Sequence, residues 1–364
     1  MIDGLETLLA GEPHLGMDEL RALVLEVLGG RRVEGRAGHA ECLSRKRVYR
    51  VHFEIGAGTR SLIVKCLPLG RSERERLASQ QWLPRLGLAE YAPPLLGVAV
   101  DRHGAIAWHV YEDLGPHALV GAMSDPQRVA AAIDAIARVH VRFSQHAILA
   151  ECRLAGGGLG AHFFEASLRD AQRNVERMLR APNVGERGRA VAAQLRTRLQ
   201  RVVGEQPERS RLLLDRGGPE TLLHGDLWTR NILTIPRPPG FHVRLIDWDH
   251  CGVGPVVYDL AAFLRRFPIQ ERRRLLEAYR GHVASMAWVW PTVAELNDMF
   301  DTAELARFAN SITWRVVAIA QADPAPAPEW AIEDLEGIDG WFDNLCAVLP
   351  VDDARGADAD RRAV

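Results

Sequence analysis

Two short stretches of the sequence carry side chains whose types and spacing suit the transfer of a phosphoryl group. The stretch "LLHGDLWTRNIL" (222–233) holds Asp226 and, five residues later, Asn231, and "RLIDWDH" places Asp247 sixteen residues beyond Asn231. Transfer from ATP needs magnesium held by hard oxygen ligands, and a carboxylate that orients the incoming hydroxyl and accepts its proton. Asp226 would be that base, and Asn231 and Asp247 would be the magnesium ligands.

Lys65 is the candidate for the cation that binds the α- and β-phosphates. The 45 basic residues are 43 arginines and two lysines, Lys46 and Lys65. Lys is a compact point charge on a slim stem, whereas Arg presents a broad planar fork, so a narrow site on a phosphate oxygen selects Lys. Lys46, within "SRKRVYR", is interpreted as a solvated surface residue.

The elements that must position these residues change in character near residue 115. Before it, residues 1–30 predict one or two amphipathic helices stopped by Gly29-Gly30, and strands and one helix follow. After it, helical periodicity dominates apart from the two stretches quoted above, which the turn "PRPPG" joins. The strands are expected at 47–55, 61–67, 94–100 and 106–115, and the helices at 71–88, 125–143, 161–204 and from about 257 onward.

These patterns predict an α+β fold with two lobes. Residues 1–114 would form a small β-rich nucleotide-binding lobe, and residues 115–350 a larger, mostly α-helical lobe that carries the catalytic and acceptor-binding groups. The polar residues 351–364 lack periodicity and are expected to be a disordered tail. The cluster "AGGGLG" (155–160) follows no clear strand, so it is interpreted as a loop and not as a nucleotide fingerprint.

The bulk composition is that of an ordinary soluble protein. The 364 residues are 47% hydrophobic with a formal net charge of −2, which favours neither nucleic acid nor membranes as partners. Five scattered cysteines without a CxxC pair indicate neither disulfides nor a zinc site, and the acidic N-terminus is unlike a secretory signal. We therefore expect a cytoplasmic monomer or homodimer.

The stretches "HGDLWTRNIL", "LIDWDHCGVGPVVYDLA" and "ARVHVRF" resemble the aminoglycoside phosphotransferase and choline kinase superfamily of small-molecule kinases, over about residues 45 to 345. The resemblance implies a protein-kinase-like two-lobe fold, ATP and Mg²⁺ as cofactors, and the roles given above for Asp226, Asn231, Asp247 and Lys65. The resemblance also implies that His224 braces the catalytic loop, that Asp259 holds this loop from a helix start, and that the hinge whose backbone meets adenine consists of Glu112, Asp113 and Leu114. Asp249, two residues after the metal ligand Asp247, is a further candidate supporting residue. An ordinary helix N-cap is the alternative reading of Asp259.

Two parts of the family pattern are less well defined. The Gly/Ser-rich nucleotide loop is expected near residues 35 to 45, within the stretch "GRAGHAECLSRKR" (35–47). The glutamate that pairs with Lys65 is either Glu73 or Glu75. Glu75 is preferred because helical spacing puts it on one face with Ala78 and Trp82.

The acceptor is expected to be the hydroxyl of a small molecule. Gly225 stands where protein kinases carry an arginine, and only twelve residues separate Asp247 from Asp259, too few for a full activation segment. Residues 295 to 345 hold eleven acids against two bases, which suits a cationic acceptor such as an aminoglycoside antibiotic or an amino alcohol. Asp298 and Asp301, one helical turn apart, are the candidate acceptor-binding pair.

Three other functions stay open. The first is a metabolic kinase for a sugar or another uncharged alcohol. The second is a metal-dependent hydrolase, which leaves Lys65 and the β-rich lobe without a role. The third is a pseudoenzyme that binds nucleotide, which the presence of base, metal ligands and lysine disfavours. The hydrolase would be built on His224, Asp226, Asp247, Asp249 and His250.

Overall fold

The computed structural model describes residues 2–3, 5, 9, 15–29, 35–44, 47–56, 58–343 and 347–350. The chain divides into two units, each assembled from separate stretches of sequence. The predicted tail, 351–364, lies outside the described residues, and the lobe boundary at 114 stays a prediction. The first unit consists of Met1–Phe143, Ala150–Gly156 and Trp228–Cys251, and the second of Ser144–Leu149, Gly157–Leu227 and Gly252–Val364.

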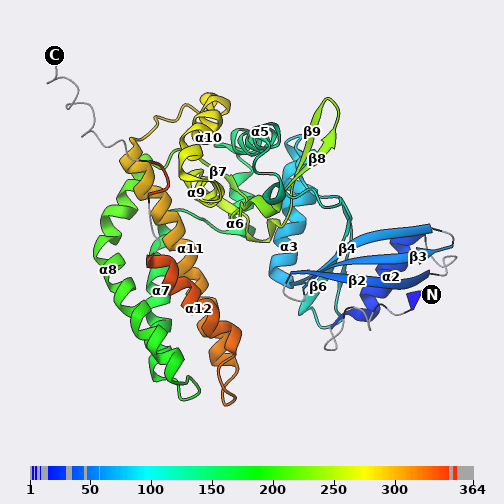
Figure 1. The fold of residues 1–364 in the computed structure, drawn as a ribbon, viewed down its shortest axis with the longest axis horizontal. Coiled ribbons are helices and arrows are strands. Elements are labelled where there is room, and N and C mark those ends of the chain that lie inside the picture. Colours follow the sequence, from blue (N-terminus) through cyan, green and yellow to red (C-terminus); the bar gives the residue numbers. More distant parts are fainter. Residues whose placement is uncertain are drawn as a thin grey trace. The chain divides into compact units, whose positions relative to one another are not determined.

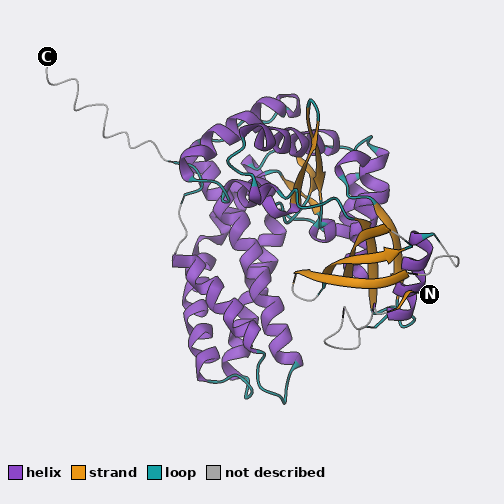
Figure 2. Cartoon of the chain, turned by 45° about the vertical axis from the view of Figure 1, so that its right-hand side comes forward, coloured by secondary structure: helices purple, strands orange, loops and turns teal. Residues whose placement is uncertain are grey.

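A mainly antiparallel sheet forms the centre of the first unit (Figures 1 and 2). Its strand order is β1-β2-β3-β4-β6-β5, and only the two-residue β1 pairs in parallel. Tyr49, Val51 and Phe53 of β3 are buried at the spacing of two that predicted a half-buried strand. They share an apolar core with Val24 of α2 (Met17–Leu28) and Trp108 of β6. The strands are β1 (Ile2–Asp3), β2 (Gly35–Ser44), β3 (Val48–Ile55), β4 (Gly58–Pro68), β5 (Leu95–Val100) and β6 (Ile106–Glu112).

Strand β2 lies where the sequence predicted a nucleotide loop. A nucleotide loop was expected near 35 to 45, whereas Gly35–Ser44 is a strand that pairs antiparallel with β3 along its length. The expectation was wrong there because most of the described β2 side chains are exposed, so the segment lacks the alternation that marks a half-buried strand. Arg45 and Lys46, which follow β2 in the sequence, lie outside the described residues.

One helical segment packs beside the sheet, as predicted for residues 71–88. It begins as α3 (Leu69–Leu77), widens into a π-helical stretch (Ala78–Trp82) and ends as the short α4 (Leu83–Arg85). The residues that α3 buries are polar, Ser72 and Glu75, so this helix brings charge and hydrogen-bonding groups to the sheet. The first unit also contains α5 (Pro126–Phe143), most of α6 (Leu149–Gly156) and the hairpin of β8 (Ile232–Arg237) and β9 (Gly240–Leu245).

Long helices make up most of the second unit. Figure 1 shows α7 and α8 running beside α11 and α12. Helix α8 continues past the predicted end at 204 and passes through Pro207 to Arg216. A capping box between Thr292 and Glu295 begins α11. The helices are α7 (Ala161–Arg180), α8 (Glu186–Arg216), α9 (Val257–Leu264), α10 (Ile269–His282), α11 (Val293–Gln321) and α12 (Glu329–Asp343), with the strands β7 (Glu220–Leu223) and β10 (Gly252–Pro255).

The α+β class predicted from the sequence is confirmed, with most strands early in the chain and the long helices later (Figure 1). Among the described residues, no helix combines the length and the apolar character that crossing a membrane requires.

Candidate active site

The two predicted metal ligands lie at one end of the β8–β9 hairpin, in the first unit. The ladder begins with the pair Ile232 and Leu245. Just outside it, the Ile246 N–H donates a hydrogen bond of 2.9 Å to the Asn231 carbonyl oxygen. The fifteen residues between Asn231 and Asp247 therefore form a hairpin that returns the chain to its starting point, which brings an amide and a carboxylate to the same place.

Asp247 leaves the hairpin in an unusual backbone conformation. Its φ of 72° and ψ of 54° are left-handed, which few residues other than glycine adopt and which Asp tolerates better than most. The next residue, Trp248, is fully buried and donates its indole N–H to the Leu245 carbonyl oxygen over 2.7 Å. This anchor fixes the turn, and the Asp247 side chain stays 38% exposed.

Lys65 of β4 lies between two carboxylates of the first unit. Its Nζ donates to Glu75 Oε2 over 2.6 Å and also to Asp247 Oδ1. Burial alone would lower the pKa of Lys65, but the charges of Glu75 and Asp247 raise it above the usual value, so the ammonium stays charged. Of the two glutamates that the sequence left open, Glu75 is the partner, whereas Glu73 pairs with Arg76 over 2.7 Å.

Asp249 adds a further carboxyl group close to this cluster. It is only 4% exposed, its Oδ2 lies 3.6 Å from Arg71 Nη1, and its carbonyl oxygen accepts from Arg74. Its Oδ1 is buried without a hydrogen-bond partner among the described residues. Burial raises the pKa of Asp249 to about 8, although the nearby Lys65 opposes this.

The catalytic loop predicted around Asp226 is held inside the second unit by Asp259. The Asp259 carboxylate accepts backbone N–H bonds from His224, at 2.7 Å, and from Gly225, at 2.9 Å. Asp259 is fully buried in the first turn of α9, whose N-cap is Val256. Its side chain therefore bonds to the loop from the first turn of the helix.

The loop residues themselves make a tight turn. Gly225 has a φ of 81°, a conformation that a side chain would strain. The Asp226 N–H donates to His224 Nδ1 over 3.3 Å, and the His224 ring is buried. Strand β7 leads into this turn and pairs with β10, Leu223 opposite Gly252, which joins the loop to the strand that precedes α9.

Sequence reasoning missed Arg307, a cation on α11 in the same unit whose side chain is 15% exposed. Its Nη1 lies 3.1 Å from Glu304, and its guanidinium stands 5.3 Å from the centre of the Tyr258 ring. Burial alone would lower the pKa of Arg307, whereas Glu304 and, to a smaller extent, Asp226 raise it above the usual value. Arg307 thus contributes positive charge to the surroundings of the predicted base. No sequence signal marked it out among 43 arginines.

The predicted hinge residues follow the end of β6 in the first unit. The Asp113 carboxylate accepts from Arg50 Nε, at 2.9 Å, and from the backbone N–H of Gly115, at 3.0 Å. The Glu112 N–H bonds to the Pro94 carbonyl oxygen over 3.1 Å, and Leu114 is half-buried. The Asp113 side chain therefore stabilises the turn after β6. That the backbone of these residues binds adenine stays a prediction.

The acid-rich segment proves to be largely paired with arginines of distant sequence. Arg187 and Arg198, both on α8, bond to acids of α12; Arg198 Nε, for example, lies 2.6 Å from Asp339. Asp301, one of the two predicted acceptor-binding residues, bonds to Arg265, and Asp298 is exposed. Much of the local excess of negative charge is thus offset by helix-to-helix ion pairs. The further pairs are Asp334 with Arg315, Glu304 with Arg307 and Glu295 with Arg216.

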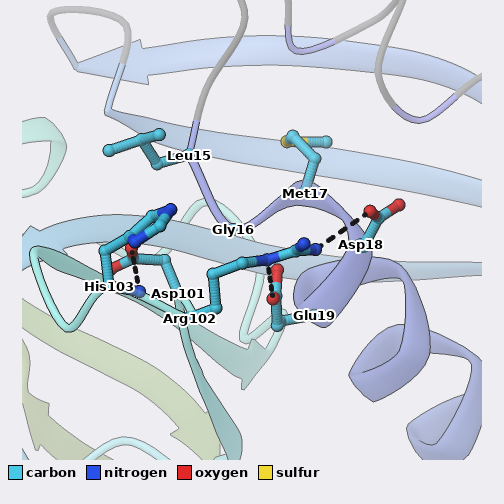
Figure 3. A pocket seen from close by; sticks show the side chains of 8 residues that line it. All are labelled: Leu15, Gly16, Met17, Asp18, Glu19, Asp101, Arg102 and His103. Carbon is cyan, nitrogen blue, oxygen red and sulfur yellow. Dashed lines mark hydrogen bonds and ion pairs between the residues drawn. The ribbon is translucent and has the colours of Figure 1, made fainter.

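A pocket of about 270 Å³ lies elsewhere in the first unit, where α2 begins (Figure 3). Arg102 spans it by ion pairs of 3.6 Å to Asp18 and 3.4 Å to Glu19. The Asp101 carboxylate accepts hydrogen bonds from three backbone N–H groups of its own turn, so it stabilises that turn. None of the predicted site residues lines this pocket. Among the residues that the structure describes, no three His, Cys, Asp or Glu side chains are grouped as metal ligands.

Comparison with known proteins places these features in a family. The family model described as the phosphotransferase enzyme family matches residues 44–296, which include every predicted catalytic and metal-binding residue. A search of curated protein sequences finds no match.

Solved structures of similar fold are small-molecule phosphotransferases by name. The GDP complex of a mutant aminoglycoside 2'-phosphotransferase has a TM-score of 0.56 at 16% identity, covering 89% of this chain and 97% of that one. The aminoglycoside phosphotransferase of Streptomyces rimosus, with ADP and streptomycin, has a TM-score of 0.50 at 18% identity, covering 80% and 99%. An ethanolamine kinase of Plasmodium vivax has a TM-score of 0.51 at 11% identity, covering 81% and 78%. At such identities the likeness shows the fold, and the predicted kinase-like architecture is confirmed.

Proposed function

This chain belongs to the phosphotransferase enzyme family, and we propose that it moves the γ-phosphate of ATP to a hydroxyl group of a small molecule. One observation carries the proposal: Lys65 bonds to both Glu75 and Asp247, while the hairpin holds Asn231 at the end where Asp247 emerges. A paired lysine beside an amide and a carboxylate is the set of groups that a magnesium nucleotide needs.

In this proposal Asn231 and Asp247 hold Mg²⁺ and Lys65 holds the α- and β-phosphates. The donor set fits, because both ligands offer hard oxygen atoms and the partly exposed Asp247 can be reached. The charge fits as well, since the two carboxylates of Glu75 and Asp247 share the single ammonium group of Lys65. When bound, Mg²⁺ neutralises charge on the phosphate oxygens. The backbone of Glu112, Asp113 and Leu114 is proposed to contact adenine.

Asp226 is the proposed base. It would orient the acceptor hydroxyl, whose oxygen attacks the γ-phosphorus as the bond to ADP breaks, and it would take up the proton that the hydroxyl releases. Two features of the second unit support this role. Asp259 fixes the two residues before Asp226 through their N–H groups, and the charges of Arg307 and Asp226 interact.

The acceptor proposed first is an alcohol that carries an amine, such as an aminoglycoside or an amino alcohol. The exposed Asp298 and the acid-rich segment support a cationic acceptor. The ion pairs of α12 with α8, and of Asp301 with Arg265, favour the second candidate, an uncharged sugar or alcohol, because they already neutralise many of these acids.

The test is an ADP-release assay with ATP and Mg²⁺ across a panel of aminoglycosides, amino alcohols and sugars. We expect release to depend on one acceptor class and to stop when Mg²⁺ is chelated. In Asp226→Asn, turnover should fall by at least about 100-fold while calorimetry shows unchanged ATP binding, because a general base acts only in the transition state. Asp170→Asn, an exposed acid on α7, is the matched control. Equal turnover in Asp226→Asn, or loss of its ATP binding, would contradict the assignment.

A further inference from the structure

The partner of Lys65 is itself held by a chain of buried polar side chains in the first unit. Glu75 uses Oε2 for Lys65, and its other oxygen, Oε1, lies 2.6 Å from the Tyr111 hydroxyl. The Tyr111 oxygen in turn lies 2.9 Å from His109 Nδ1, and His109 Nε2 lies 2.6 Å from the Ser72 hydroxyl. All four groups behind Lys65 are at most 5% exposed.

The register of the sheet explains why these side chains meet. Lys65 of β4 stands directly opposite His109 of β6, and Tyr111 lies two residues along the same strand, so the three side chains share one face of the sheet. Ser72 and Glu75 lie three residues apart on α3 and are the residues that this helix buries. The chain of hydrogen bonds therefore joins the helix to the sheet at two points.

The chemistry of the groups fixes the direction of every bond. Lys65 can only donate, so Glu75 accepts as a carboxylate, and the Tyr111 hydroxyl must donate its single proton to Oε1. The Tyr111 oxygen then accepts from His109, which places the His109 proton on Nδ1. His109 Nε2 is left as an acceptor, so Ser72 donates to it.

The charge states agree with this direction. Burial, followed by the nearby Glu75 carboxylate, raises the pKa of Tyr111 well above its usual value, so the phenol keeps its proton. Burial, with a smaller contribution from the charge of Lys65, lowers the pKa of His109 to about 3. The imidazole is thus neutral at pH 7 and carries one N–H, as the chain of bonds requires.

We propose that Ser72, His109 and Tyr111 form a one-way hydrogen-bond relay that positions Glu75 and, through it, Lys65. They are positioning residues, because none of them is assigned a contact with the substrate. The relay sets the Glu75 rotamer by holding the oxygen that Lys65 does not use, so the ammonium is already in place when a nucleotide arrives. The sequence shows only that His109 and Tyr111 are two polar residues at strand spacing within the apolar "IAWHVYE", and it does not show that they face Lys65.

The first measurement is of the His109 tautomer, which does not depend on any activity. Long-range proton–nitrogen NMR correlations of histidine-labelled protein, assigned with His109→Gln, should show the proton on Nδ1 at pH 7 and no protonation down to pH 5. A proton on Nε2, or a charged ring, would reverse or break the relay and overturn the inference.

The second measurement rests on the proposed function, since it requires Lys65 to bind ATP. Tyr111→Phe removes the donor to Glu75, and we expect the KM for ATP to rise about tenfold with kcat changed less than about twofold. Tyr91→Phe, which removes a hydroxyl from another buried tyrosine of the same unit, should leave KM unchanged. An unchanged KM in Tyr111→Phe would overturn the positioning role. A wild-type protein without ATP turnover would count against the proposed function alone, because the NMR result would still decide the relay.

Discussion

At the scale of single residues, Lys65 is the position where we expect the fewest residue types to be tolerated. Its Nζ fits between Glu75 and Asp247 because the amine ends in one atom with three donors, each of which can turn toward a different oxygen. A guanidinium has the same charge but a rigid planar fork with several nitrogen atoms. The gap that suits the ammonium is therefore too small for an arginine.

We expect Lys65→Arg to raise the KM for ATP by roughly ten- to a hundredfold, because the bonds of a charged group are lost without a change in net charge. Steady-state kinetics and calorimetric titration with ATP measure the effect. The control is Arg60→Lys, the opposite exchange at an exposed position of the same strand, which should change neither quantity. If Lys65→Arg had wild-type kinetics, the site would not require a lysine, and this lysine could have been retained by chance.

Residue types and spacing were enough to nominate Asp226, Asn231, Asp247 and Lys65, and helical periodicity was enough to prefer Glu75 over Glu73. The relay behind Glu75 was out of reach, because it depends on the β4–β6 register that puts His109 opposite Lys65. Arg307 was out of reach for a related reason, since α11 and the loop before Trp228 are far apart in the chain.

At the scale of elements, hydrogen bonds join β7, the loop that carries Asp226 and α9 within the second unit. A carboxylate at the start of α9 accepts from two consecutive N–H groups of the loop, and this leaves the loop few alternative conformations. Both N–H groups are buried, so each would lose a hydrogen bond without gaining water if the acceptor were removed.

Asp259→Asn replaces one of the two acceptor oxygens with an NH₂ group that faces a donor. We expect a loss of roughly 1–3 kcal/mol in the free energy of unfolding, from one unsatisfied buried N–H, and a fall in kcat larger than any change in the KM for ATP. Urea unfolding and steady-state kinetics give the two numbers. Asp215→Asn, at an exposed acid near the end of α8, is the control. A stability loss with an unchanged kcat would show that Asp259 is structural only.

Most elements could be predicted because their apolar residues recur at the spacing of the buried face, as Tyr49, Val51 and Phe53 do on β3. Strand β2 escaped because its side chains are mostly exposed and its pairing with β3 is a backbone property. The hairpin that brings Asn231 back to Asp247 could be suspected from the turn "PRPPG", but its register could not be predicted from side chains alone.

At the scale of the whole molecule, the charge pattern of the sequence is misleading when read locally. Eleven acids gather within residues 295 to 345, while arginines that pair with several of them come from α8, about 140 positions earlier. A local count of charges along the sequence includes the acids of α12 but not their arginine partners on α8. The asymmetry that suggested a cationic acceptor is therefore in large part a means of joining two helices.

We expect Arg187→Gln combined with Arg198→Gln to lower the Tm at low ionic strength, because acids of α12 then face one another without counter-charges. The difference from the wild type should shrink near about 1 M salt, where the screening length falls to about 3 Å. Calorimetry at two salt concentrations measures this. Arg177→Gln, on α7, provides a comparison. An equal drop in Tm at both concentrations would mean that packing of the long arginine stems, and not charge, joins the helices.

The first unit is assembled from three stretches of the chain, and the last of these runs from Trp228 to Cys251. During synthesis on the ribosome, Lys65 and Glu75 emerge long before the hairpin that supplies Asn231 and Asp247. For the time needed to make well over a hundred further residues, the nascent lysine has one of its two carboxylate partners and lacks the other. A truncated product that ends after α5 would contain Lys65 and Glu75, yet it would lack both proposed ligands of the metal.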